Sequence, residues 1–154
     1  MNFAAERSAG ASTRYFDEVR NGEQLPTVTF TLPIYRLVVA AGANRDFNSI
    51  HHNADYAKST GAPDMYANVL FLLGMWERIV RDWIGEGGTI NSLKGFRMRR
   101  FTTVGTTATI FAHVADKRIE DGMGIVVLSV RTEDTDGITV GPGTIEVALP
   151  LHRN

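Results

Sequence analysis

The sequence predicts an α+β domain in which one antiparallel sheet wraps around a single long helix. Within residues 68–84, apolar residues recur at offsets of 3, 4, 7, 10, 11 and 14 from Val69, which is the period of one helix face. After Gly88 the chain consists of β-branched segments separated by glycine-containing turns. A half-buried helix followed by four long strands hides its apolar face when the sheet curls around it.

The segments before this helix are expected to be short. Residues 1–13 are rich in Ala and Ser and are expected to form a loosely held arm. Residues 14–25 place apolar residues among charges ahead of an Asn-Gly turn, so we expect them to lie along the domain surface. A short strand is predicted at residues 28–30. A helix follows it, with Thr31 as its cap and Gly42 as its end.

The second half of the chain supplies the predicted core. Asn53 is expected to cap one or two helical turns that end at Gly61. The helix over residues 68–84 would be about 25 Å long, and its composition predicts that it is buried all round where it begins and reaches solvent near its end. Gly141-Pro142-Gly143 indicates a bulge or an edge position in the last strand. The four strands are predicted at residues 89–101, 106–114, 123–131 and 138–149.

Composition narrows the classes of protein. A chain of 154 residues is most economically one domain, 1–154, with a sizeable core. Its 16 Lys and Arg nearly balance 17 Asp and Glu, so no global field attracts nucleic acid or an anionic membrane. The absence of cysteine excludes disulfides, thiolate catalysis and cysteine-bound zinc. The first residues resemble neither a secretory signal nor a membrane span, so we expect a cytoplasmic protein.

The segment most suggestive of chemistry is RDFNSIHHNADYA, residues 45–57. Asp46, Asn48 and His51 fall within six residues, so a loop that turns into a short helix can direct all three side chains at one small volume. A carboxylate, an imidazole and an amide together can handle one water and one proton. The alternative roles are structural: Asp46 caps a helix or pairs with Arg45, His51 is a buried hydrogen-bonded imidazole, and Asn48 braces the loop.

This segment resembles the hydratase motif of the MaoC-like, (R)-specific enoyl-CoA hydratases, which runs Asp, any residue, Asn, Pro, aliphatic, His, with Tyr-Ala shortly after. RYFDEV and VGTTATIFAHV also resemble that family, so the likeness covers most of the chain. There are departures, because Ser49 replaces Pro, Asn53 replaces a common Asp, and Arg45 replaces a small residue. A cation paired with the motif's acid would weaken it as a base. The matching positions are Asp46, Asn48, Ile50, His51, Tyr56 and Ala57.

The resemblance implies a hot-dog fold and an activity in fatty-acid or related acyl-CoA metabolism. The reaction would be reversible syn addition of water to a trans-2-enoyl thioester, giving an (R)-3-hydroxyacyl thioester. Asp46 and His51 would form the catalytic pair, with Asn48 holding the loop or the water. Backbone N–H groups near Asn68 and Val69 would bind the thioester oxygen at the start of the long helix.

No metal or redox cofactor is required for this reaction, and the substrate carrier would be coenzyme A or acyl carrier protein. A single hot-dog sheet has open edges, so we expect a homodimer or a heterodimer with a similar subunit. Arg97 and Arg99 share one face of a predicted strand and could bind the phosphates of coenzyme A, the alternative being a solvated face.

Two other functions remain open. The first is a hot-dog acyl thioesterase, whose Asp, Gly-His, Asn-Asn, Tyr pattern differs from this segment in acid-to-His spacing and in its glycine. The second is a non-catalytic hot-dog subunit that completes the acyl pocket of a partner. A metal site built from His51, His52 and Asp55 is disfavoured, because the sequence contains neither HExxH nor cysteine. The length of the acyl chain and any ring in it stay open.

Overall fold

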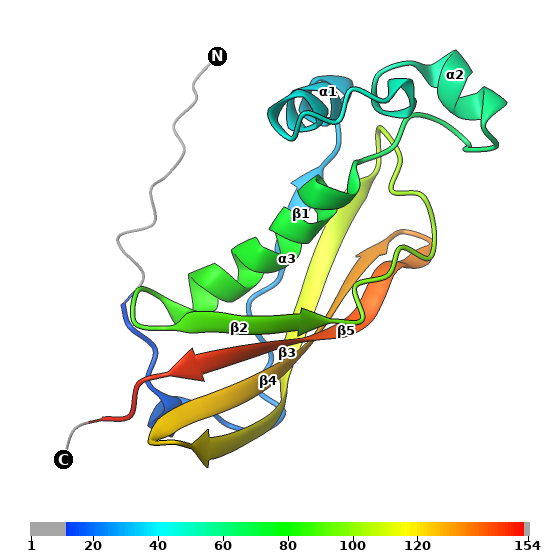
Figure 1. The fold of residues 1–154 in the computed structure, drawn as a ribbon. Helices are drawn as coiled ribbons and strands as arrows, with labels where there is room; N and C mark the ends of the chain where they lie inside the picture. Colours follow the sequence, from blue (N-terminus) through cyan, green and yellow to red (C-terminus); the bar gives the residue numbers. More distant parts are fainter. Residues whose placement is uncertain (1–11, 153–154) are drawn as a thin grey trace.

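The computed structural model describes residues 12–152 and contains one five-stranded antiparallel sheet curled around the helix α3 (Figure 1). The strand order is β1-β3-β4-β5-β2, so β1 and β2 are the edges. The predicted α+β arrangement is thereby confirmed, while the arm expected at residues 1–13 falls mostly on residues 1–11, outside the described residues. The elements are η1 (Phe16–Glu18), β1 (Val28–Thr31), α1 (Ile34–Ala43), η2 (Ser49–His51), α2 (Ala54–Ser59), α3 (Val69–Ile84), β2 (Thr89–Lys94), β3 (Thr107–Glu120), β4 (Met123–Asp134) and β5 (Gly137–Leu149).

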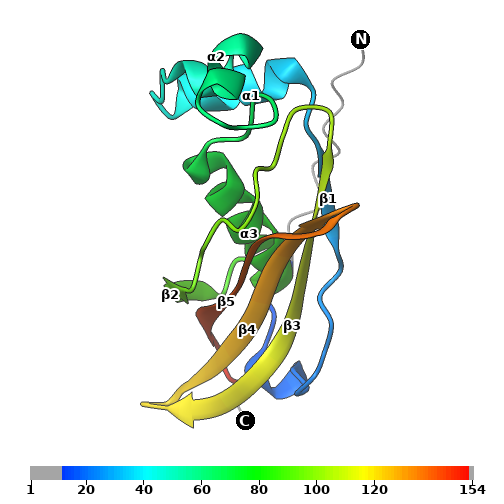
Figure 2. The ribbon, with the colours of Figure 1, turned by 90° about the vertical axis from the view of Figure 1, so that its right-hand side faces the viewer.

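The core lies between α3 and the concave face of the sheet (Figure 2). Trp76 is fully buried there, and its indole Nε1 donates a hydrogen bond of 2.8 Å to the hydroxyl of Thr132 on β4. Gly141 lets the sheet approach α3 closely, because a Cβ at this position would lie 2.9 Å from the Trp76 ring. The helix contributes Leu72, Met75, Trp76, Ile79, Val80 and Ile84, and the facing strand residues include Ile110, Val114, Leu128, Val130, Ile145 and Val147.

The start of α3 differs from the prediction. It was expected to be buried all round, yet Val69 and Leu70 are 46% and 51% exposed. The helices α1 and α2 lie together beyond this end of α3 (Figure 1), and they leave one side of its first turn open. An apolar residue at a helix start gives the same sequence signal whether its own chain covers it or not. Within residues 12–152, no helix is both long and apolar enough to cross a membrane.

Two helix-boundary predictions are wrong at α1. Thr31 belongs to β1, and Pro33 occupies the N-cap position of α1 without a side-chain cap. The helix continues through Gly42 to Ala43, and Asn44 is its C-cap. Gly42 has room for a Cβ and an ordinary backbone conformation, so nothing forces the helix to end there.

The strand predictions also need correction in three places, and the first is that β3 runs on to Glu120 instead of ending at residue 114. β2 ends at Lys94, and residues 95–106 are irregular apart from isolated bridges such as the one between Met98 and Val140. β5 lies between β4 and β2, so its Gly-Pro-Gly segment is not at an edge of the sheet. The alternative prediction of a bulge is correct, because the β4–β5 register shifts between Val130 and Thr132, opposite this segment.

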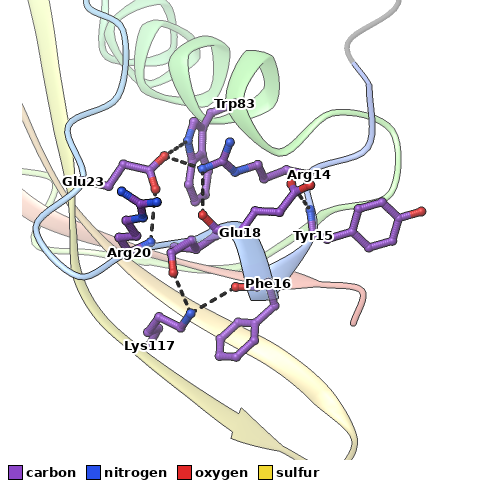
Figure 3. A network of polar contacts seen from close by, with 9 residues as sticks. Arg14, Tyr15, Phe16, Glu18, Arg20, Glu23, Trp83 and Lys117 are labelled. Atoms are coloured by element: carbon purple, nitrogen blue, oxygen red, sulfur yellow. Dashed lines mark hydrogen bonds and ion pairs between the residues drawn. The ribbon is translucent and has the colours of Figure 1, made fainter. Parts of the chain in front are cut away.

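The segment before β1 is anchored to the domain more firmly than its sequence suggested. Arg14 pairs with Glu23 at 2.6 Å, and the indole of Trp83 donates to the same carboxylate at 3.2 Å (Figure 3). Lys117 of β3 donates to the carbonyl oxygens of Phe16 and Val19 at 3.1 and 2.6 Å. Phe16 and Val19 are themselves buried. This network lies at the C-terminal end of α3, far along the helix from the motif segment.

Candidate active site

The loop between α1 and η2 positions the predicted acid. The backbone N–H of Asp46 donates to the carbonyl of Ala41 at 2.9 Å, which ties the loop to the last turn of α1. Arg45 adopts a left-handed conformation with φ 56°, which turns the chain sharply just before the acid. Asn48 caps η2, since its Oδ1 accepts from the N–H of Ile50 at 3.2 Å. Asn48 therefore braces the loop, as one sequence hypothesis held.

The side chains of Asp46 and His51 meet. Asp46 Oδ2 lies 2.9 Å from His51 Nε2, and the two residues are brought together by the short helix η2. His51 is only 4% exposed, whereas the Asp46 side chain is partly open to solvent. The other ring nitrogen, Nδ1, lies 2.7 Å from the carbonyl oxygen of Tyr66. The ion pair of Asp46 within the described residues is with His51 rather than with Arg45.

These contacts limit where hydrogens can lie in the pair. A carbonyl oxygen can only accept, so His51 Nδ1 must carry a hydrogen. In a neutral imidazole Nε2 would then be an acceptor, and it faces Asp46 Oδ2, which is also an acceptor when ionised. Two acceptors at 2.9 Å repel each other unless a proton lies between them. A proton between these two atoms would give the pair one proton to donate and leave it one basic site to receive another.

Tyr66 forms a wall of this site. Its ring stands edge to face against the His51 imidazole, with centroids 5.4 Å apart and planes at 79°, and packs on Phe101 at 4.7 Å. Burial, and then the negative charge of Asp46, raise the pKa of the Tyr66 phenol above its ordinary value of 10.0. Tyr66 is therefore a neutral phenol at physiological pH. On its other side the ring borders a cavity of about 200 Å³, which Arg99, Phe101 and Thr102 also line.

The start of α3 lies three residues beyond Tyr66 and brings helix amides to the same region. Asn68 caps the helix, since its Oδ1 accepts from the N–H of Phe71 at 2.9 Å. The same oxygen accepts from Asn44 Nδ2 at 3.3 Å, which joins the end of α1 to the start of α3. The amides of Val69 and Leu70 belong to the first helical turn, where an N–H has no intrahelical acceptor.

The two arginines predicted to bind phosphate both lie in the irregular segment after β2. The guanidinium of Arg99 donates to the carbonyl of Gly141, and Arg99 borders the cavity beside Tyr66. The side chain of Arg97 is exposed, and its carbonyl accepts from the N–H of Gly141. The structure thus does not align them on one strand face. No group of three or more His, Cys, Asp or Glu within residues 12–152 is close enough to bind a metal.

Sequence reasoning missed Tyr66 and Asn44. The contact of Tyr66 with His51 uses a main-chain carbonyl, which every residue possesses, so no side-chain pattern identifies it. Asn44 contributes through a contact to Asn68, 24 positions away. For Asn68 a signal was available, because an asparagine directly before a strongly periodic helix is typical of an N-cap.

Comparison with known proteins identifies the family. No protein-family model matches the chain. The beta subunit of 3-oxo-4,17-pregnadiene-20-carboxyl-CoA hydratase from Mycobacterium tuberculosis is 31% identical over 113 residues, which make up 73% of this chain and 83% of that protein. The chain belongs to the MaoC-like hydratase family.

Solved structures agree on the hot-dog fold of this MaoC-like protein. A chain in the ChsH1–ChsH2 complex from Mycobacterium tuberculosis superposes with a TM-score of 0.76 and 29% identity over 84% of this chain and 98% of that one. The unliganded (R)-hydratase PhaJ1 from Pseudomonas aeruginosa gives a TM-score of 0.78 and 19% identity over 90% of this chain and 86% of that one. The family resemblance stated from residues 45–57 is therefore confirmed.

Proposed function

We propose that this MaoC-like protein catalyses the reversible hydration of trans-2-enoyl thioesters to (R)-3-hydroxyacyl thioesters. The observation that carries the proposal is the 2.9 Å contact between Asp46 Oδ2 and His51 Nε2, with His51 Nδ1 fixed on the Tyr66 carbonyl. A hydratase needs one base and one acid within reach of the same water, and this pair supplies both. The related beta subunit carries the word hydratase in its name, which supports the same class of reaction.

The proton balance of the pair suits the reaction. Water adds its oxygen to C3 while the basic site of the Asp46–His51 pair removes one of its protons, and the shared proton of the pair goes to C2. The C2=C3 double bond becomes a single bond, and the pair ends with the same number of protons with which it began. Because one pair on one side of the substrate handles both protons, the addition is syn. The reverse sequence dehydrates the 3-hydroxyacyl thioester.

Negative charge develops on the thioester oxygen between the two steps. The amides of Val69 and Leu70 at the start of α3 are suited to bind it, because first-turn amides lack helical acceptors and lie at the positive end of the helix dipole. Such donors typically contribute a factor of about 10² to 10³ in kcat. We assign the substrate carbonyl to this end of α3, with C3 about 3 Å from the attacking water.

Assembly with a second hot-dog chain would complete this site. Several apolar side chains of this region are exposed to solvent, including Val39 at 65% and Phe47 at 74% exposure, together with Val69 and Leu70. Covering them would remove apolar area from water, which is a favourable term in association. The relative is named as a beta subunit and the similar structure is a two-component complex. We propose a dimer, either of two copies or with a similar subunit.

The carrier of the acyl group is coenzyme A or acyl carrier protein. The exposed side chain of Arg97 is the better candidate for the carrier's phosphates, since the guanidinium of Arg99 already donates to Gly141. A non-catalytic subunit is the less favoured role, because Asp46 and His51 are both present and in contact.

The test is an assay with crotonyl and longer trans-2-enoyl thioesters. Hydration removes the conjugated enoyl absorbance without releasing free thiol, and chiral analysis should find the (R) product. A thioesterase attacks the carbonyl carbon instead, so it releases thiol. Thiol release in step with the absorbance loss, abolished by Asp46→Asn, would establish the thioesterase function and refute the hydratase.

A further inference from the structure

The side chain of Asn68 has a buried donor that its capping role does not use. Asn68 is 3% exposed, and its Oδ1 accepts two hydrogen bonds, from Phe71 N and from Asn44 Nδ2. Its Nδ2 has no hydrogen-bond partner among the residues that the structure describes. A buried donor without a partner is costly, and such groups in folded proteins usually have an explanation.

The orientation of this amide follows from its neighbours. The N–H of Phe71 can only donate, so the atom 2.9 Å from it must be the carbonyl oxygen of Asn68. Exchanging the oxygen and nitrogen of the Asn68 amide would remove the helix cap and place its NH₂ group against the N–H of Phe71, which is also a donor. The NH₂ group is therefore directed away from the first turn of α3.

Capping does not explain why an asparagine stands here. Aspartate, serine and threonine cap helices about as well, through a single acceptor oxygen, and none of them would leave a buried NH₂ group. The contact with Asn44 Nδ2 also needs only an acceptor. The NH₂ group is thus the one feature of Asn68 that its contacts within the chain do not use.

The position of Asn68 points to the ligand that this donor serves. Asn68 follows Tyr66, whose carbonyl fixes His51, by two residues, and its partner Asn44 precedes Asp46 by two. The amide therefore lies beside the loop that carries the proposed catalytic pair, at the positive end of α3. The hydroxyl of Thr102 is likewise buried without a partner in residues 12–152, and the carbonyl of Thr102 binds the N–H of Ala67 at 2.9 Å. Two buried polar groups without a partner among residues 12–152 thus lie close together here.

We infer that the side-chain NH₂ of Asn68 donates a hydrogen bond to the carbonyl oxygen of the bound thioester, beside the first amides of α3. This inference rests on the proposed function and names a binding atom for it. The donor strengthens its interaction as negative charge moves onto that oxygen, so it favours the transition state over the bound substrate. Its loss should act mainly on kcat rather than on KM.

Two substitutions separate this donor from the cap. Asn68→Asp keeps an acceptor for the N–H of Phe71 but replaces NH₂ by oxygen, and Asn68→Ser keeps a neutral cap with no amide. The matched control is Asn53→Asp, because Asn53 caps α2 in the same way, accepting from Tyr56 N at 3.0 Å, while its own side chain is exposed. The full chain is used in the assembly in which it purifies.

The primary readouts are kcat and KM for crotonyl thioester hydration. We expect both Asn68 variants to lose about 10² to 10³-fold in kcat with little change in KM, and Asn53→Asp to keep wild-type kcat. The second readout is the absorbance of bound cinnamoyl-CoA, whose band moves to the red when a donor polarises the thioester carbonyl. This shift should be present with the wild type and with Asn53→Asp, and reduced with Asn68→Ser.

The outcomes distinguish this inference from the proposed function. A wild-type chain that does not hydrate enoyl thioesters refutes the function, and the red shift of cinnamoyl-CoA still reports on Asn68. Hydration by the wild type with unchanged kcat and red shift in Asn68→Ser overturns the inference alone. If circular dichroism shows that Asn68→Asp does not fold, Asn68→Ser decides the question by itself.

Discussion

Asp46 and His51 should behave as one unit when either is replaced. Asp46→Asn keeps a hydrogen-bonding group beside His51 Nε2 but cannot receive a proton. His51→Ala removes the imidazole and both of its contacts, the 2.9 Å contact with Asp46 and the 2.7 Å contact with the Tyr66 carbonyl. Because the proposed reaction uses one proton shared across the pair, the loss of either partner removes both the acid and the base. Either substitution should therefore abolish most of the activity.

The expected size follows from the chemistry of the pair. A positioned acid or base contributes about 10² to 10⁴ in rate, which corresponds to about 3 to 5 kcal/mol in the activation free energy. Two independent groups would multiply, giving about 10⁴ to 10⁸ for the double variant. Two groups that share one task should give a double variant little worse than either single one.

The assay is kcat/KM for crotonyl thioester hydration in the wild type, both single variants and the double variant, with Asp55→Asn as control. Asp55 is an exposed acid in the first turn of α2, so its amide variant should keep wild-type activity. His51→Ala leaves the Tyr66 carbonyl without its partner, which costs about 1 to 3 kcal/mol in the free energy of unfolding. Urea unfolding of each variant verifies that the losses are not losses of folded protein. Multiplicative losses in the double variant would refute the shared proton.

Three further predictions follow from particular contacts. The raised pKa of Tyr66 means that the folded protein holds the phenol proton more tightly than the unfolded chain does, so the free energy of unfolding falls as the pH rises above the ordinary value of 10.0. In urea titrations at alkaline pH, Tyr66→Phe should therefore lose less free energy of unfolding with rising pH than the wild type loses. Thr132→Val should cost about 1 to 3 kcal/mol in urea unfolding at nearly constant volume, because it leaves the buried indole N–H of Trp76 without an acceptor. Leu70→Glu should shift sedimentation from dimer to monomer, and it should not weaken α3, because an acidic residue is favourable in the first turn of a helix. The control Ile119→Glu, also at an exposed apolar position, should leave the dimer intact. A wild-type chain that sediments as an active monomer would contradict the proposed assembly.

The parts of the site that the sequence could predict are local. Asp46, Asn48 and His51 lie within one short loop and η2, so their spacing limits how far apart they can be. The period of residues 68–84 likewise identified α3 to within one residue, because burial of one face of a long helix leaves a repeated signal. The cap at Asn53 was correct for the same reason, since a cap acts on the next turn of its own chain.

The parts that the sequence could not predict depend on distant contacts. The partner of His51 Nδ1 is a main-chain carbonyl 15 positions away, which no residue type reveals. Arg97 and Arg99 were placed on one strand face because residues 89–101 have strand composition, but β2 ends at Lys94 and Arg99 turns to the backbone of β5. Strand composition specifies a half-buried surface rather than the residue at which pairing stops.

The exposed start of α3 connects assembly to chemistry. The amides proposed to bind the thioester oxygen belong to Val69 and Leu70, and the side chains of these same two residues are about half exposed. A partner that covers those side chains would exclude water from the first turn of the helix. In the lower dielectric that results, a hydrogen bond from these amides or from Asn68 to a developing negative charge becomes stronger. The exposed apolar residues at this helix start are therefore positioned to strengthen the proposed catalysis once a partner binds.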